Sequence, residues 1–545
     1  MTQKLRGGEF LSATSHPQQQ FSPEDFSAEH LDIARSALEF WNLEVEPNLD
    51  AIRHKQTGVL RAVLRKSAEL GFTAISIPER FGGMELDLPS ALIVEECFAR
   101  DASYLVTHGG QAGIGALALV HWGTPEQQAK YLPKVASAEF MAAYALTEPQ
   151  AGSDALNVRT RADLSSDGTH YILNGQKMWI TNGGMADLFT VFAKVGAEHF
   201  TAFLVERAYP GVTAGTEENK MGLHGSSTTA VFFDNVPVPV ENVLGEVGRG
   251  HIVAFNILNF GRLKIGAYAA GASKDILRLC VQYAKERKAF GSSIADFGAI
   301  QHKLAEMAVN IYAVESMTWR VVGLVQDAMR EGAGELTALE EFAIECSIVK
   351  VFASEAVGRV ADEGVQIHGG FGYHHDYAVE RHYRDARIFR IFEGTNEINR
   401  QLIVTMLLKR MARGRLTDTP PPAGTDVLAQ AKSIAWAALS LARDTFGASL
   451  EKNQEVVARI ADIIMQSFAI ESVVGRAQKT DSTAAAEMAA VLIADAASKI
   501  NFAACEVFCA CSQTQIPEIV LGQVDAIGLR RKIARRVLDA GRYVV

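Results

Sequence analysis

The spacing of apolar and polar positions divides the chain into three regions. From 27 to 140 the apolar residues mostly follow helical spacing, as in Leu31–Phe40, which comes after Ser27, a residue type that caps helices. From 141 to 245 short apolar runs are separated by Gly, Pro and Asn, which is typical of strands. Helical spacing returns from 246 to 412. This order predicts a mainly α fold with a central β domain.

Short apolar runs mark the strands that we expect in the β region. They are Tyr171–Ile180, Phe189–Ala193, Thr201–Val205 and Ala230–Phe233. Asn174 and Gly175 are neighbours inside the first run, and an Asn-Gly pair between apolar residues predicts the turn of a hairpin. The β domain is therefore expected to contain a hairpin at this point.

A proline-rich segment follows the second helical region. Pro420, Pro421 and Pro422 are consecutive, so 413–425 is predicted to be a linker. Beyond it, 426–545 is rich in alanine at helical spacing, which predicts a helical extension. The chain has no run of 18 apolar residues and the extension has no strong amphipathic block, so contact with a membrane is not favoured.

Composition and charge narrow the class of protein. The 545 residues are 48% apolar and 21% charged, which excludes intrinsic disorder, and the net charge of −10 argues against a nucleic-acid partner. The six cysteines include no CxxC pair, and the N-terminus has no signal-like apolar run, so a cytoplasmic location is expected. Cys505, Cys509 and Cys511 lie in an apolar helical stretch and are predicted to be buried thiols. No spacing of histidine, cysteine and acidic residues matches a metal motif, so no metal site is expected.

Two polar segments in the β region contain residues suited to a bound ring or phosphate. Tyr144–Asp154 combines Thr147 and Ser153 with a glycine, and small residues expose backbone N–H groups. In the next strand, alternation would place Trp179 and Thr181 on one face, as a stacking and hydrogen-bonding pair. Taken alone, such segments are more often an ordinary loop and a tryptophan in a sheet core.

Three more segments with candidate chemistry lie in the second helical region. Arg287 suits bidentate phosphate binding, and Phe290 suits packing on a planar group, although a solvated helix end would look the same. The glycines of Gln366–Tyr373 let a backbone approach a ligand closely. Glu393, flanked by a phenylalanine and a glycine, is predicted to lie in an apolar slot, where desolvation raises its pKa and makes it a usable base.

These five segments, in this order, resemble the acyl-CoA dehydrogenase family over 27–411. The strings Leu-Thr-Glu-Pro-Gln-Ala-Gly-Ser-Asp and Glu-Gly-Thr-Asn-Glu-Ile are signatures of that family. The linker and extension resemble the very-long-chain branch, whose members carry such an extension. The resemblance implies the acyl-CoA dehydrogenase fold, namely an α-helical domain, a β-barrel-like domain and an α-helical bundle, here followed by the C-terminal helical extension.

The resemblance also implies a role for each matching residue. Glu393 corresponds to the catalytic base that removes the α-proton of an acyl thioester, and FAD is the cofactor that takes the β-hydrogen as hydride. The residues that match flavin contacts are Tyr144, Thr147, Ser153, Trp179, Thr181, Arg287, Phe290, Gln366, Gly369, Gly370, Thr395 and Glu397. The residues that match substrate contacts are Ser153, Asn259, Arg262 and Gly394. Some members place the base immediately before the arginine that matches Arg262, but this chain has Gly261 there.

The implied function is FAD-dependent oxidation of long-chain saturated acyl-CoA to trans-2-enoyl-CoA in fatty-acid β-oxidation. The backbone N–H of Glu393 would bind the thioester oxygen as enolate charge develops. Electrons would pass to an electron-transfer flavoprotein, and the protein would be a homodimer in which each subunit helps to hold the flavin of the other. An acyl-CoA oxidase of the same fold and a flavin-fold assembly or binding protein are the alternatives.

Small residues bear on the length of the acyl chain. Gly109, Gly110, Gly113 and Gly115 fall in a stretch that the family packs beside the acyl tail. They would either leave room for a long chain or allow helices to pack tightly, and the sequence does not choose between these.

Overall fold

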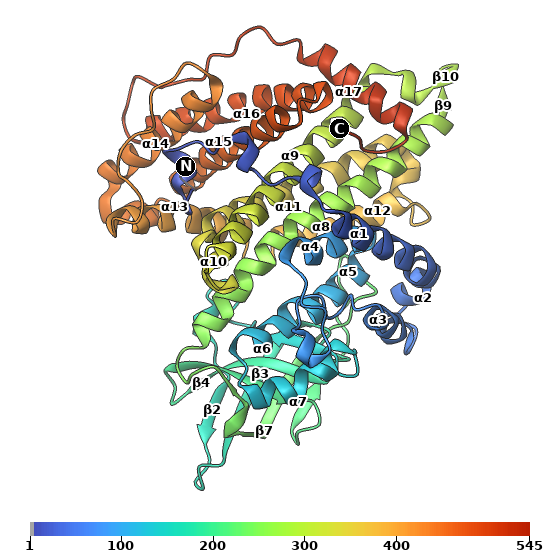
Figure 1. Ribbon diagram of the computed structural model, residues 1–545, viewed down its shortest axis with the longest axis vertical. Helices are drawn as coiled ribbons and strands as arrows, with labels where there is room; N and C mark the ends of the chain where they lie inside the picture. The colour runs from blue at the N-terminus through green and yellow to red at the C-terminus, as the bar shows by residue number, and fades with distance from the viewer. Residues whose placement is uncertain (1–4) are drawn as a thin grey trace. The chain divides into compact units, whose positions relative to one another are not determined.

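The computed structural model describes residues 5–545, and this part of the chain forms two compact units (Figure 1). One unit is continuous and runs from Ser27 to Gly261. The other joins the N-terminal residues up to Phe26 to the segment Arg262–Val545. The mainly α fold with a central β domain is confirmed.

The continuous unit begins with helices. They are α1 (Ala28–Phe40), α2 (Leu49–Arg53), α3 (Val59–Glu69), α4 (Leu88–Phe98), α5 (Ala102–Gly109), α6 (Ala116–Trp122) and α7 (Pro125–Ala136). Ser27 caps α1, since its hydroxyl accepts a hydrogen bond from the backbone N–H of His30 at 3.2 Å. The helix expected after Ser27 is therefore confirmed together with its start.

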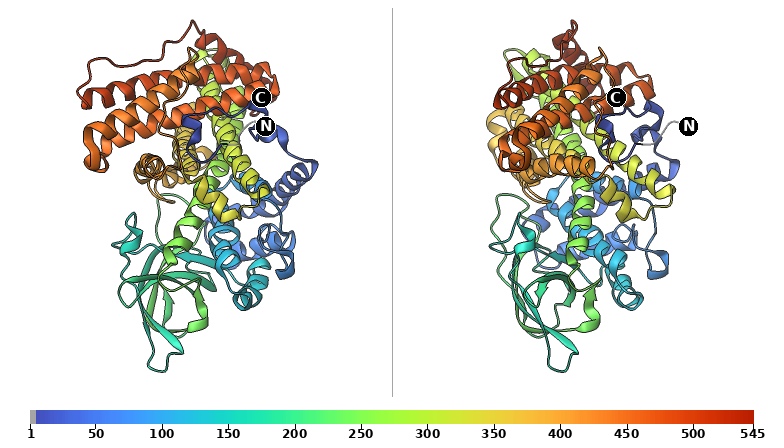
Figure 2. Two further views of the ribbon diagram at one scale, coloured as in Figure 1. Left: turned by 60° about the vertical axis from the view of Figure 1, so that its left-hand side comes forward. Right: turned by 90° about the vertical axis from the view of Figure 1, so that its left-hand side faces the viewer.

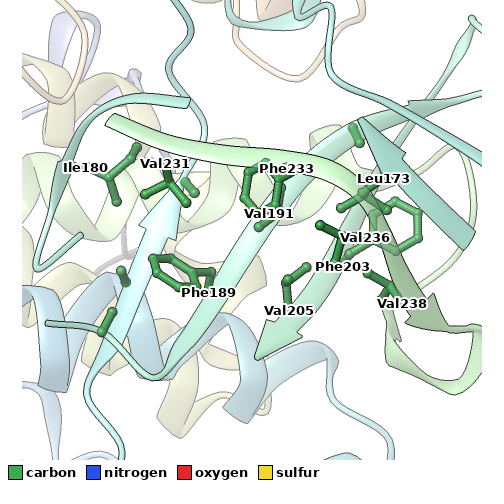
Figure 3. Close-up of a cluster of buried hydrophobic side chains, with 14 of the residues drawn as sticks. Leu173, Ile180, Phe189, Val191, Phe203, Val205, Val231, Phe233, Val236 and Val238 are labelled. Atoms are coloured by element: carbon green, nitrogen blue, oxygen red, sulfur yellow. The ribbon is translucent and has the colours of Figure 1, made fainter. Parts of the chain in front are cut away.

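The same unit continues as an eight-stranded sheet with the strand order β6-β7-β3-β2-β4-β5-β8, and β1 pairs with β4. The strands are β1 (Ala142–Ala145), β2 (Arg161–Leu164), β3 (His170–Thr181), β4 (Leu188–Val195), β5 (His199–Glu206), β6 (Val212–Ala214), β7 (Thr228–Pro239) and β8 (Val243–Leu244). Apolar side chains of β3, β4, β5 and β7 face one another and form a buried core, which includes Phe189, Phe203 and Phe233 (Figure 3). The strands expected at Phe189–Ala193, Thr201–Val205 and Ala230–Phe233 are present.

The hairpin expected at Asn174 and Gly175 is wrong. Strand β3 continues through both residues and pairs with β2 on one side and β7 on the other. The register shifts at this point, and Gly175 has a φ of 152°. A Cβ at Gly175 would lie 2.5 Å from the Thr160 hydroxyl oxygen, so the glycine allows close approach of a neighbouring segment within a bulged strand.

The glycine-rich stretch before α6 forms a π-helical turn, η7 (Gly110–Gly115), in which Gly113 has non-helical dihedral angles. A Cβ at Gly110 would lie 2.9 Å from the side-chain nitrogen of Asn182, and a Cβ at Gly115 would lie 2.8 Å from the Cβ of Ala142. At these two positions the absence of a side chain serves tight packing against the β region.

The second unit is built from long helices and one short hairpin. Its helices up to the proline-rich segment are α8 (Gly250–Glu286, which begins in the first unit), α9 (Gly298–Arg330), α10 (Glu335–Glu341), α11 (Ala343–His368), α12 (Ala378–Ala386) and α13 (Asn396–Ala412). The hairpin pairs β9 (Lys288–Ala289) with β10 (Ser292–Ser293). Helices α9 and α11 pack against each other and are buried over most of their length.

The C-terminal extension adds α14 (Val427–Phe446), α15 (Gln454–Thr480), α16 (Thr483–Ala510) and α17 (Ala526–Ala540). Helices α14, α15 and α16 lie side by side (Figure 2). Between α13 and α14 the chain has neither helix nor strand. By length and composition α16 could cross a membrane, and half of its most apolar window is buried in this unit.

Two of the three cysteines predicted to be buried in the extension are exposed. Cys505 and Cys509 lie one turn apart on the outer face of α16, and only Cys511 is buried. Alanine is tolerated on both the buried and the exposed face of a helix. The composition of this alanine-rich stretch therefore does not identify which of its faces is buried.

The N-terminal residues before α1 carry no sequence motif, yet they pack on the extension. The backbone N–H of Ser15 donates to Glu471 at 2.9 Å. The carboxylate of Glu24 forms an ion pair with Arg476 at 2.6 Å. Polar contacts of this kind join the two ends of the chain in one unit.

Candidate functional site

Glu393 lies on a short loop between the 3-10 turn η12 (Arg387–Arg390) and helix α13. Glu393 has a φ of 58° and Gly394 has a φ of 79°. A left-handed backbone at a non-glycine residue costs about 1–3 kcal/mol and persists only where the surroundings enforce it. The loop therefore needs contacts that hold it.

Side chains from two helices hold the carbonyl groups of this loop. On α13, the side-chain amide of Asn399 donates to the carbonyl oxygens of Gly394 at 2.8 Å and Thr395 at 3.0 Å. On α11, Lys350 donates from Nζ to the same Gly394 carbonyl at 2.6 Å. At the start of α13, the Thr395 hydroxyl accepts from the backbone N–H of Ile398 at 3.3 Å and caps the helix. These bonds offset the cost of the left-handed pair.

The Glu393 carboxyl group is desolvated. Burial raises its pKa to about 7, although the positive charges of Arg262, Lys350 and Lys264 act in the opposite direction. Its Oε2 atom is buried and makes no hydrogen bond in the described part of the chain. A buried acceptor without a partner is costly, which is typical of an atom that meets a ligand. The raised pKa is in the direction expected from the sequence.

Arg262 and Lys350 are buried cations beside Glu393. Arg262 donates from Nε to the Glu393 carbonyl oxygen at 3.3 Å, and burial lowers the pKa of its guanidinium. Burial likewise lowers the pKa of Lys350 to about 7, and its Nζ also donates to Asn396 Oδ1 at 2.7 Å. Sequence reasoning missed Lys350. The only signal was a single lysine within the apolar stretch of α11.

A second group in the same unit comprises the residues matched to the outer half of the flavin. The Arg287 guanidinium lies 5.6 Å from the centroid of the Phe371 ring. Phe290 is 97% exposed, at the turn of the β9–β10 hairpin. Gln366 is exposed, and no atom lies within 4 Å of a Cβ built on Gly369 or Gly370. This group and the Glu393 loop belong to the same unit.

The remaining flavin matches lie in the continuous unit. Trp179 is 61% exposed and has a φ of 56°, at an irregularity where the register of β3 on β7 shifts. The strand alternation that would place Trp179 and Thr181 on one face is therefore interrupted. The backbone N–H of Met178 donates to the Thr147 carbonyl at 2.8 Å, which fixes the Thr147 loop beside Trp179, while Ser153 is exposed further along that loop.

A buried ion pair anchors the Thr147 loop. Lys177 Nζ lies 2.7 Å from Glu148 Oε1, and both side chains are almost fully buried. Burial lowers the pKa of Lys177 to about 8. For Glu148, burial acts to raise the pKa, but the charge of Lys177 and the Thr160 hydroxyl hold it below its usual value. This pair lies next to two predicted flavin residues, and sequence reasoning did not find it.

Tyr144 and Asn259 are also in the continuous unit. The Tyr144 hydroxyl donates to the backbone carbonyl of Ala254 on α8 at 3.4 Å, and its ring centroid lies 5.0 Å from that of Phe192. Asn259 is a buried polar residue of α8.

The residues present fit a flavin dinucleotide. A planar ring needs exposed aromatic or apolar surface, and Trp179 and Phe290 each offer such a surface. A diphosphate needs open backbone and an arginine, which Gly369, Gly370 and Arg287 supply. The unpartnered carboxylate oxygen of Glu393 leaves a place for a reacting group.

Comparison with known families agrees with this reading. Models of the N-terminal, middle and C-terminal domains of acyl-CoA dehydrogenase match residues 27–139, 143–236 and 248–408. Another model described as an acyl-CoA dehydrogenase C-terminal domain matches residues 430–524, in the extension.

Some relatives match this chain over nearly its full length, and others match only part of it. A probable acyl-CoA dehydrogenase of Bacillus subtilis is 40% identical over 99% of this chain and 98% of its own length. The human mitochondrial very long-chain specific acyl-CoA dehydrogenase is 46% identical, but over 62% of this chain and only 51% of its own length. The match thus spans about half of that relative.

The fold of the whole chain has a solved counterpart. The crystal structure of an acyl-CoA dehydrogenase complexed with FAD from Bacillus anthracis has a TM-score of 0.94 and 39% identity to this chain, and covers 99% of this chain and 100% of its own. The expected resemblance to the very-long-chain branch and the expected cofactor are confirmed. The chain belongs to the acyl-CoA dehydrogenase family of FAD-dependent oxidoreductases.

Proposed function

We propose that this acyl-CoA dehydrogenase oxidises long-chain saturated acyl-CoA to trans-2-enoyl-CoA, with Glu393 as the base, and passes the electrons to an electron-transfer flavoprotein. The observation that carries the assignment of Glu393 is its buried, unpartnered Oε2 atom on a loop held in a left-handed conformation. A carboxyl group with a pKa of about 7 is a stronger base than an ordinary glutamate, and still ionises near neutral pH.

The carboxylate of Glu393 would take the proton from the α-carbon of the thioester. The α C–H bond breaks, its electron pair forms the new double bond, and the β-hydrogen leaves with its own pair. When bound, FAD supplies the acceptor for that hydride. The three cations around Glu393 favour its ionised form before the reaction, and burial favours the protonated form that results.

The thioester oxygen needs hydrogen-bond donors as negative charge develops on it. The backbone N–H of Glu393 donates to no acceptor in the described part of the chain, whereas the next two carbonyl groups are fixed by Asn399 and Lys350. A fixed, unoccupied N–H beside the base suits the role of an oxyanion donor. In this proposal Ser153, Asn259, Arg262 and Gly394 contact the acyl-CoA.

The preference for long chains rests on the likeness to the very-long-chain enzymes. The glycines before α6 give no further support for a long-chain preference, because neighbouring atoms already fill the space beside Gly110 and Gly115. Anaerobic bleaching of the flavin by acyl-CoAs of increasing length tests this preference, and a maximum with short chains would contradict it.

We further propose a homodimer in which each subunit contributes to the partner's flavin site. Arg287, Phe290, Gln366, Gly369 and Gly370 lie on an open surface, as a group that serves a second subunit would. The resemblance to the very-long-chain branch implies that the extension takes the place of a second pair of subunits, which favours a dimer over a tetramer. Sedimentation equilibrium of the FAD-loaded protein tests the proposed dimer.

We also propose a cytoplasmic location, because all six cysteines are free thiols, as is usual in a reducing compartment.

The replacement Glu393→Gln separates the candidate functions. It keeps the size of the side chain but removes the base, so turnover should fall at least about 100-fold while the yellow flavin stays bound. Near-normal turnover would refute the role of Glu393. Release of peroxide with substrate and air alone would favour an oxidase, and a purified protein without flavin absorbance would favour a binding protein.

A further inference from the structure

A large cavity lies in the unit that contains the extension, and Glu393 is not among the residues that line it. It has a volume of about 870 Å³ and is lined by parts of α9, α11, α12, η12, α16 and α17. None of the residues matched to the flavin or the substrate lines it. Its cationic side chains are Arg359, Arg387, Arg390, Lys499 and Arg530, and its acidic ones are Glu306, Asp362, Glu363 and Asp495.

Most of the acids are already paired. Arg530 donates to Glu306 and forms a second ion pair with Asp495 at 2.8 Å. Glu363 is paired with Lys303, which points to it from α9. These pairs leave Asp362 as the acid of the lining without a recorded cation in the described residues.

Four cations of the lining are not held in an ion pair with any described residue. Arg359, Arg387, Arg390 and Lys499 form no ion pair within residues 5–545, and Arg359 makes one hydrogen bond, to Asn310 Oδ1 at 3.1 Å. Glu355 also acts on Arg359 and Lys499, but it is paired with Arg400 at 2.8 Å. The cavity thus carries an excess of positive charge.

The cations are close enough to repel one another. Desolvation lowers the pKa of Lys499, which keeps an exposed side chain, and the charge of Arg359 lowers it further, while Asp495, Glu306 and Glu355 act in the opposite direction. Desolvation also lowers the pKa of Arg359, and the charge of Arg390 acts in the same direction, whereas Glu355, the larger charge effect, and Glu306 oppose it. A Cβ at Gly358 would lie 2.4 Å from Arg390 Nη2, so the absence of a side chain there makes room for the guanidinium at the wall. Like charges held together in this way cost free energy, which an anion between them would return.

The geometry points to a binding site in this cavity for a small organic phosphate, distinct from the flavin and acyl-CoA sites. Guanidinium groups bind phosphate oxygens in pairs, and several cations around one space suit a group with more than one negative charge. The volume falls within the range of about 300–1,000 Å³ that small-molecule sites occupy. The apolar side chains of Met307, Phe352 and Leu492 in the lining can cover the organic part.

Isothermal titration of the full-length, FAD-saturated protein tests the site, with inorganic pyrophosphate, ADP and citrate as probes. Arg387→Gln and Lys499→Gln each remove one cation that has no ion pair to lose. Arg535→Gln is the matched control, because Arg535 is exposed on α17 outside the cavity. Each cavity variant should weaken pyrophosphate and ADP binding about tenfold. The control should leave binding unchanged.

The source of the phosphate is read from the same titrations. If ADP binds more tightly than pyrophosphate, the cavity recognises a nucleotide-like phosphate. If the two bind equally, the cavity recognises the phosphate groups alone. Citrate that binds as tightly as either would overturn the assignment to phosphate. The inference also fails if the wild type binds neither probe at millimolar concentration, or if the cavity variants bind as the wild type does. These outcomes do not depend on Glu393, so they stand apart from the test of the proposed reaction.

Discussion

Lys350 fixes the carbonyl group of Gly394, with its Nζ atom 2.6 Å from that oxygen. Lys350 is fully buried on α11, and Gly394 is the residue after the proposed base. The lysine thus acts on Glu393 in two ways. It holds the left-handed loop in place, and its charge favours the ionised carboxylate. We regard Lys350 as a positioning residue.

Replacement of Lys350 by methionine should therefore impair catalysis in two measurable ways. Loss of the hydrogen bond should lower kcat about tenfold or more, because a loop with unfavourable backbone angles would relax. Loss of the positive charge should raise the pKa of Glu393, so the rising limb of the pH–rate profile should move to higher pH. Steady-state kinetics between pH 5 and 9 would measure both.

Asn399→Ala is the control that separates these effects. Asn399 holds the same carbonyl group but carries no charge, so this variant should lower kcat and leave the pH profile in place. A Lys350→Met enzyme with an unshifted profile and a normal kcat would show that the lysine has only a packing role.

The wild-type enzyme should itself show a pH dependence set by Glu393. Its pKa is about 7, and only the ionised form can accept the α-proton. Below pH 7, kcat/KM should fall about tenfold per pH unit. The midpoint of this fall in kcat/KM should report the pKa of Glu393 in the free enzyme. A profile that stays flat down to pH 5 would exclude Glu393 as the group that titrates.

The fold was predictable as far as local patterns determine it. The helix after Ser27 follows from helical spacing of apolar residues, and the strands at Phe189–Ala193 and Thr201–Val205 follow from short continuous apolar runs, which suit strands buried on both faces. The hairpin at Asn174 failed because an Asn-Gly pair indicates a turn only if the chain reverses there, and a close approach by Thr160 requires the same glycine. Such a tertiary contact leaves no trace in the spacing of apolar residues.

The candidate site was predictable where it rests on a recognisable string. Glu393 stands in such a string, and its raised pKa follows from burial. Lys350 and Lys177 could not be found in this way, because each is a single lysine whose partner lies elsewhere in the sequence. Buried cations of this kind become visible only when the fold brings their acceptors to them.

A second buried glutamate should make stability depend on pH. Glu345 lies beneath the N-terminal segment, where its Oε1 accepts from the Gly8 N–H at 2.6 Å and its Oε2 has no partner within the described residues. Burial raises its pKa to about 7, against the weaker effects of the Gly8 hydrogen bond and the charges of Arg410 and Arg320. The folded state therefore binds more protons than the unfolded state between about pH 4.5 and 7, and stability is lost as pH rises through this window.

Glu345→Gln should remove that loss, since glutamine keeps the acceptor for Gly8 without a charge. The free energy of unfolding at pH 8 should rise by about 2 kcal/mol, with little change at pH 5. Glu341→Gln is the matched control, because Glu341 accepts from Gly7 but is paired with Arg410. A gain for the control equal to that of Glu345→Gln, in urea titrations at both pH values, would contradict this assignment.

The buried pair of Lys177 and Glu148 should matter for both stability and flavin retention. In Lys177→Met, Glu148 remains buried without its cation, which should destabilise the protein by about 3–5 kcal/mol. The Thr147 loop that it anchors should loosen, so the flavin should dissociate more readily on dilution. Calorimetry and the fluorescence of released FAD would measure the two effects.

The double variant Lys177→Met with Glu148→Gln should recover much of the stability, because no lone charge is then buried. Lys194→Met, on β4 of the same sheet, should change neither quantity, and a single variant as stable as wild type would show that the loop is held by its backbone hydrogen bonds alone.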